Sequence, residues 1–127
     1  MEENRVTHMI HDVGSIGQVQ IADDVVAIIA GLAATEAEGV ESMAGNITNE
    51  LVSKLGMKNL SKGVKVQVTE DGVFVDLALV LKFGYSIPKV SENVQEKVKS
   101  AIENMTGLNV VEVNIRIASV LLEQNID

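Results

Sequence analysis

The chain has 127 residues, of which 46% are hydrophobic, and it carries 18 acidic against 10 basic side chains for a formal net charge of −8. A chain of this length predicts one domain around a single core. The absence of cysteine excludes disulfides and thiolate metal sites and favours a cytoplasmic location, and the negative charge argues against general nucleic-acid binding, which depends on neutralising phosphates.

The acidic charge is concentrated in the first part of the chain. Residues 1–53 hold nine acids and one base, whereas residues 54–127 hold nine of each. Within this neutral part, four lysines occur in twelve residues with no acid among them: Lys54, Lys58, Lys62 and Lys65. This lysine cluster predicts a local basic patch on an acidic protein.

The start of the chain lacks the basic segment and the apolar stretch of a signal peptide. Residues 1–16 show no sustained periodicity and predict a flexible N-terminal arm, followed by a single domain over residues 17–122 and a tail over residues 123–127. The longest apolar run, residues 25–34, is about half as long as a membrane-spanning helix. We therefore expect a core helix there rather than a membrane anchor.

Residues 18–21 alternate polar and apolar side chains, which predicts a strand. From Asp23 onward the apolar residues recur every three or four positions, which predicts a helix that ends near Gly39 and has Asp23 or Asp24 as its N-cap. A short second helix is predicted within residues 46–56. The stripe of the first helix that we expect to face the core is Val25, Ile28, Ile29, Leu32 and Ala33.

Residues 64–69 and 73–83 predict a β-hairpin, because both segments alternate with period 2 and Asp71-Gly72 is typical of a two-residue turn. With Asp71 and Gly72 as the loop, Val66 lies opposite Leu77. In this register the apolar residues of both strands share one face.

Ser86 and Pro88 predict the start of a long helix that ends at Gly107, and residues 111–117 predict a last strand. The order β-α-α-β-β-α-β predicts an α+β two-layer sandwich, in which helices cover one face of a mainly antiparallel sheet of three to four strands. This split βαβ topology resembles a ferredoxin-like fold. The apolar stripe of the long helix is Val90, Val94, Val98, Ile102 and Met105.

No group of residues predicts a catalytic, cofactor-binding or metal site. His8, His11 and Asp12 have a spacing that could hold a metal on a helix, but they fall in the predicted arm, and a metal site needs three or four rigidly held ligands. Asp76 lies in mid-strand on the face opposite the core. We expect it to be a solvent-facing residue, paired with Arg116 if their strands are neighbours, rather than a catalytic acid.

The sheet face opposite the helices predicts an interaction surface. Its apolar residues Phe74, Ala78 and Val80 are framed by polar groups such as Asp76 and Arg116, a composition typical of partner sites. Alternatively, the N-terminal arm folds across this face as a third layer. The lysine cluster predicts a second patch, which docks onto an acidic surface such as the first half of another copy.

Several separated blocks of the chain, in order, resemble the alkaline shock protein family, the YloU-like envelope stress response proteins of Gram-positive bacteria. The resemblance spans about residues 17–117 and implies a non-enzymatic cytosolic protein linked to envelope homeostasis and stress. It implies protein partners, through self-association into a homo-oligomer or through a membrane-anchored partner, with no direct membrane insertion and no cofactor. The blocks that carry it are Gly17–Ile21, Ile28–Ala34, Leu60–Val66, Val75–Leu77, Ile87–Pro88, Asn93–Glu96, Met105–Gly107 and Val110–Ile117.

Two other function classes stay open. The basic segment Lys54–Lys65 and the sandwich shape also fit a module that binds a small ligand or RNA, and an enzyme is the third hypothesis. Salt-dependent binding of single-stranded RNA that requires Lys58 and Lys62 would indicate the binding module. Turnover that requires Asp76 would indicate an enzyme.

Overall fold

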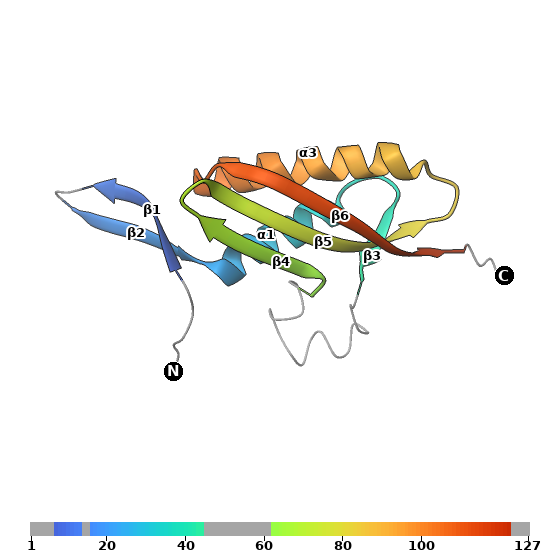
Figure 1. Cartoon of the computed structure of the whole chain (residues 1–127), viewed down its shortest axis with the longest axis horizontal. Coiled ribbons are helices and arrows are strands. Elements are labelled where there is room, and N and C mark those ends of the chain that lie inside the picture. The colour runs from blue at the N-terminus through green and yellow to red at the C-terminus, as the bar shows by residue number, and fades with distance from the viewer. Residues whose placement is uncertain (1–6, 14–15, 45–61, 123–127) are drawn as a thin grey trace.

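The computed structural model describes residues 7–13, 16–44 and 62–122 and has the predicted α+β two-layer architecture (Figure 1). In the described part of the chain, two helices pack on one face of a four-stranded sheet, and two strands form a separate hairpin. The predicted short helix within residues 46–56 lies outside the described residues, as do Lys54 and Lys58. In chain order the elements are β1 (Thr7–Val13), β2 (Gly17–Ala22), α1 (Asp23–Thr35), β3 (Val40–Met43), β4 (Val64–Thr69), β5 (Gly72–Lys82), α3 (Ile87–Thr106) and β6 (Val110–Leu121).

Strand β5 is the centre of the four-stranded sheet. It pairs antiparallel with β3 and β4 and parallel with β6. The Ala78 N–H donates to the Gly63 carbonyl at 2.9 Å, and the Ala78 carbonyl accepts from the Ala44 N–H at 2.8 Å. Because both groups of a strand residue point to the same edge, β4 and β3 lie end to end along one edge of β5, and β6 lies along the other.

The core lies between β5 and the two helices. Every second residue of β5 from Val73 to Leu81 is buried, and these side chains share one cluster with the buried residues of α1 and α3. The alternation that predicted the core face of this strand is therefore confirmed.

The hairpin of β4 and β5 differs from the predicted register by two residues. Val66 lies opposite Val75 rather than Leu77, and the loop is Glu70-Asp71, so that Gly72 already belongs to β5. Gly72 has a φ of +133°, and a Cβ there would meet the Asn109 carbonyl oxygen at 2.5 Å. A close approach of the chain before β6 thus requires this glycine, and because the shift is even, the apolar residues keep their face.

Residues 7–13 form a strand, although the sequence predicts an irregular arm there. Strand β1 pairs with β2 from Thr7 opposite Ala22 to Val13 opposite Gly17, with an irregularity between Met9 and His11 that interrupts the alternation. The predicted strand over residues 18–21 is confirmed as part of β2. The hairpin extends from the N-terminal end of α1 beyond the four-stranded sheet (Figure 1), so its described residues do not form the alternative third layer.

Helix α1 begins at Asp23 as predicted, but its N-cap is Ala22, and no side chain caps it. The face that contacts the core also differs from the prediction, since Val25 and Leu32 are 39% and 49% exposed. The helix is apolar on most of its circumference, so periodicity alone could not identify the buried side. The buried side is Val26, Ala27, Ile29, Ala30, Gly31, Ala33 and Ala34, whose small residues allow close packing.

Helix α3 has the predicted ends. The Ser86 hydroxyl accepts a hydrogen bond from the Lys89 N–H at 3.4 Å, and Gly107 ends the helix in the left-handed conformation, with a φ of +79°. Four of the five predicted stripe residues are buried, whereas Met105 is 68% exposed and Thr106 takes its place in the core. The buried residues keep a repeat of four as far as Thr106. Because one turn has 3.6 residues, this row drifts around the helix, and Met105, three residues after Ile102, lies to one side of it.

Candidate functional site

The face of the sheet that the helices leave uncovered carries the predicted interaction surface. We call it the open face and define it by the outward residues of three strands: Lys65 and Gln67 of β4, Phe74, Asp76, Ala78 and Val80 of β5, and Glu112, Asn114 and Arg116 of β6. Phe74, Ala78 and Val80 are half-buried and point to the same side of β5, with Asp76 between Phe74 and Ala78. They form an apolar strip in the middle of a polar surface.

The register of the sheet arranges the polar residues in rows across the strands. In one row, Lys65 of β4, Asp76 of β5 and Asn114 of β6 lie side by side. In the next row, Ala78 lies between Gly63 and Arg116. Gly63 has no side chain and Ala78 has only a methyl group. The surface of the sheet is therefore depressed at the second row relative to the first.

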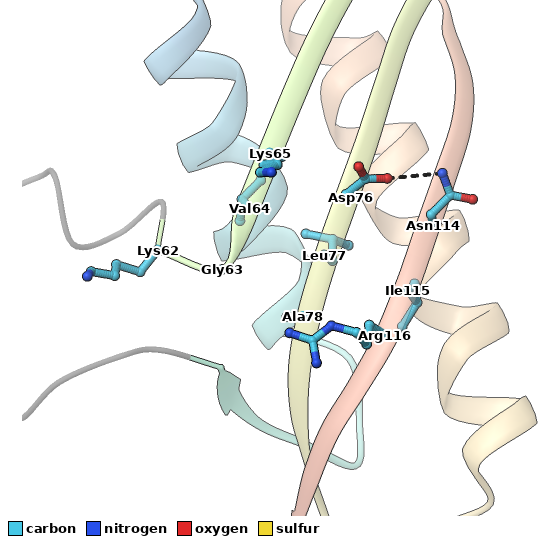
Figure 2. A pocket seen from close by; sticks show the side chains of 10 residues that line it. All are labelled: Lys62, Gly63, Val64, Lys65, Asp76, Leu77, Ala78, Asn114, Ile115 and Arg116. Atoms are coloured by element: carbon cyan, nitrogen blue, oxygen red, sulfur yellow. Dashed lines mark hydrogen bonds between the residues drawn. The ribbon is translucent and has the colours of Figure 1, made fainter.

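A hollow of about 660 Å³ opens above this second row (Figure 2). Figure 2 shows the Arg116 side chain reaching from β6 over Ala78, while Lys65 lies on the β4 side and Asp76 and Asn114 close one end. The complete lining is Lys62, Gly63, Val64, Lys65, Asp76, Leu77, Ala78, Asn114, Ile115 and Arg116.

The hydrogen bonds of the hollow correct one expectation. Asp76 does not pair with Arg116; its Oδ1 accepts from the Asn114 Nδ2 at 3.0 Å, because the parallel register places Asn114 directly opposite. The same Asn114 amide donates to Glu112 at 3.1 Å. Arg116 lies opposite Ala78, one row further along β6.

The cations of the hollow lack acidic partners. Within residues 7–13, 16–44 and 62–122, the side chains of Lys62, Lys65 and Arg116 form no hydrogen bond or ion pair. Three positive groups therefore face one negative group, Asp76, on a chain whose formal charge is −8. Anionic ligands or acidic protein segments are the partners that such a site favours.

Two of the predicted surfaces thus meet in one place. Lys62 and Lys65 of the lysine cluster lie beside Asp76, Ala78 and Arg116 of the sheet face, although the sequence assigns them to separate patches. Their neighbourhood depends on the pairing of β4 with β5 and of β5 with β6. Phe74 and Val80 lie on the same face outside the lining of the hollow.

The sequence did not single out Gly63 as part of the site, and the structure shows its contribution. Gly63 has a φ of +83°, and a Cβ there would meet the Ala44 carbonyl oxygen at 2.5 Å. The junction where β3 and β4 meet along β5 therefore excludes any side chain at this position. A Gly-Val step before an alternating segment was the only signal of this junction.

Two other polar contacts are structural. His8 of β1 contacts the Asp23 carboxylate at the start of α1 and so connects the hairpin to the helix. At the C-terminal end of α3, Glu103 accepts from the Val110 N–H at 2.9 Å and from the Lys99 ammonium at 3.0 Å. These two hydrogen bonds, the backbone one first, hold the pKa of Glu103 below its ordinary value.

Among residues 7–13, 16–44 and 62–122, no three histidine or acidic side chains lie together in a group that could hold a metal ion. Neither of the helices described in this part of the chain combines the length and the hydrophobicity that crossing a bilayer requires.

Comparisons with known proteins find relatives over nearly the whole chain. A model of the Asp23 family, described as having a cell envelope-related function, matches residues 11–122; the family is named after a protein and not after residue Asp23 of this chain. YqhY of Bacillus subtilis (strain 168) is 42% identical over 120 residues, which are 94% of this chain and 89% of that protein. YloU of the same strain is 35% identical over 106 residues, or 82% of this chain and 88% of YloU.

A more distant relative carries a functional name. A stress response regulator gls24 homolog of Streptococcus pyogenes serotype M3 (strain ATCC BAA-595 / MGAS315) is 28% identical over 112 residues, which are 87% of this chain and 63% of that protein.

Proposed function

Because the chain belongs to the Asp23 family, with its cell envelope-related function, we propose that it is a non-enzymatic interaction protein of envelope homeostasis and the stress response. It acts in the cytoplasm by binding a protein on its open face. The bound protein is either another copy of the chain or a partner anchored in the membrane.

The composition of the open face is the observation that supports this proposal. The strip of Phe74, Ala78 and Val80 is half-buried in the isolated chain and lies next to the unpaired cations of the hollow. Apolar strips with a polar surround are typical of protein interfaces, in which the apolar centre contributes affinity and the charged rim contributes specificity. The opposite face of the sheet is already covered by the helices.

Self-association through the open face can be tested by light scattering on the full chain. Removing apolar contacts with Phe74→Ala plus Val80→Ser is expected to lower the mass of the assembly towards that of the monomer. Met105→Ala is the matched control, because it removes an apolar side chain that is 68% exposed on α3. An assembly whose mass is unchanged in the double variant, or a wild-type chain that is already monomeric, would contradict this branch of the proposal.

A second candidate function is favoured by the hollow itself. A cavity of about 660 Å³ lies in the range of small-molecule sites, which is about 300–1,000 Å³. This observation supports the small-ligand form of the binding module.

A further inference from the structure

We propose that the hollow on the open face binds a small anion that carries at least two carboxylate or phosphate groups. This inference is independent of the proposed protein interaction. It rests on the placement of Lys65, Arg116 and Asp76 around the row of Gly63 and Ala78.

Lys62, Lys65 and Arg116 have no polar side-chain partner among the described residues. In the described chain, Lys99 of α3 forms an ion pair with Glu103 at 3.0 Å. In the hollow, Lys65 and Asp76 are opposite each other on neighbouring strands, yet Asp76 bonds to Asn114 instead. The positive groups thus remain available to an anion that enters from solvent.

The spacing of the cations sets the number of anionic groups. Lys65 and Arg116 belong to β4 and β6, which flank β5 on opposite edges. Strands in a sheet are about 4.8 Å apart, so the two backbones are separated by roughly 10 Å. The Arg116 side chain spans part of this width because it reaches over Ala78 (Figure 2), and a ligand with two anionic groups can contact this guanidinium and the Lys65 ammonium at once. The Arg116 guanidinium can bind a carboxylate or phosphate with two parallel hydrogen bonds.

The floor of the hollow leaves room for the ligand. Ala78 is the only side chain of β5 between the two walls in this row, and Gly63 beside it excludes a side chain because of the Ala44 carbonyl oxygen. A larger residue at position 78 would point into the hollow, since Ala78 faces away from the helices. Ala78→Leu therefore fills the site without changing any charge.

Asp76 makes one end of the hollow negative. Its carboxylate repels an anionic group at its own end of the hollow, and the hydrogen bond from Asn114 leaves further lone pairs of this carboxylate available. A hydroxyl or amine of the ligand is the group that would donate to them. The preferred ligand therefore combines two acidic groups with a hydrogen-bond donor.

The test is an NMR titration of the 15N-labelled full chain at constant ionic strength. Citrate, which has three carboxylates and a hydroxyl, and pyrophosphate, which has two phosphates, are the probes; acetate and inorganic phosphate are their single-group controls. We expect saturable shifts at the amides of Lys65, Ala78 and Arg116 with at least one of the two larger probes. The larger probe that saturates identifies carboxylates or phosphates as the preferred group.

The variants distinguish binding at this specific site from a nonspecific effect of charge. Arg116→Ala and Ala78→Leu should each raise the apparent Kd at least tenfold, whereas Lys97→Ala, which removes an exposed lysine of α3, should leave it unchanged. Equal shifts with all four anions, or a Kd that neither variant changes, would overturn the proposal. Saturation by a single-stranded RNA oligonucleotide but by no small anion would also overturn it, in favour of a nucleic-acid site.

Discussion

At the scale of single residues, Gly72 lies where another segment of the chain approaches so closely that no room is left for a side chain. Its φ of +133° is unfavourable for a side chain, and a Cβ would lie 2.5 Å from the Asn109 carbonyl oxygen. The Val73 N–H donates to this same oxygen at 2.7 Å. The start of β5 and the segment before β6 therefore cannot move apart without losing a hydrogen bond.

Gly72→Ala is accordingly expected to lower the free energy of unfolding by about 2–3 kcal/mol, through backbone strain plus a clash. Urea unfolding of the purified chain measures it. Gly84→Ala is the matched control, because Gly84 also has a positive φ, of +100°, but nothing lies within 4 Å of its added Cβ. If both variants lose equal stability, the contact with Asn109 has no energetic effect of its own.

Glu103 joins the end of α3 to the beginning of β6. Its carboxylate accepts from the Val110 N–H and from Lys99, and these hydrogen bonds lower its pKa in the folded state. Because the pKa of Glu103 is lower in the folded state than in the unfolded state, its ionised carboxylate stabilises the fold at pH values above its unfolded-state pKa. That contribution is lost as the pH falls through the lower, folded pKa.

We expect Glu103→Gln to be less stable than the wild type at pH 7, with a difference that shrinks as the pH falls below 4.5, the ordinary pKa of a glutamate. Urea unfolding at a series of pH values measures this difference. Glu96→Gln, at an exposed position on the same helix, serves as the control. A stability difference for Glu103→Gln that is constant from pH 7 to strongly acidic pH would contradict the assigned role of its charge.

At the scale of elements, the sequence predicts a helix or strand best where one face alone is apolar. The stripe of α3 and the alternation of β5 predict both the elements and their buried residues. Helix α1 has apolar residues on most sides, so its existence was predicted correctly and its buried face was not. Strand β1 was missed because its irregular pairing with β2 interrupts the alternation.

The candidate site shows a similar limit. The residues of the open face followed from the alternation of β5 alone, since period 2 assigns Phe74, Ala78 and Val80 to one side. The hollow could not be predicted, because it depends on the parallel pairing of β5 with β6 and on the junction at Gly63. Neither feature leaves a periodic pattern in the sequence. The pairing of β5 with β6 also places Asn114 opposite Asp76, which the sequence alone could not predict.

The end of α3 provides a test of how far a helical stripe continues. Ile102 is fully buried, whereas Met105, three residues later in the predicted stripe, is 68% exposed. Ile102→Ala should therefore lower the free energy of unfolding by about 3 kcal/mol through lost burial and a cavity. Met105→Ala should change it by less than about 0.5 kcal/mol. Comparable losses in urea unfolding would show that Met105 is covered in solution.

At the scale of the whole molecule, the two faces of the sheet differ in what covers them. The helices cover one face and complete the core, while the other presents an apolar strip beside unpaired cations. The hairpin of β1 and β2 lies beyond the end of the sheet and leaves this face uncovered by the described residues (Figure 1). A protein that acts through interactions would use the face that its own core does not need.

Photo-crosslinking in living cells tests whether the open face binds a protein. A photoreactive phenylalanine analogue at Phe74 of the full chain is expected to capture a discrete protein, either a second copy or a membrane-anchored partner, because this residue lies on the open face. The same analogue at Met105, which is exposed on α3, is the control. We predict a defined adduct at position 74 that is lost when Val80→Asp is added to a chain that still folds. No adduct at position 74, or the same adducts from both positions, would contradict the account.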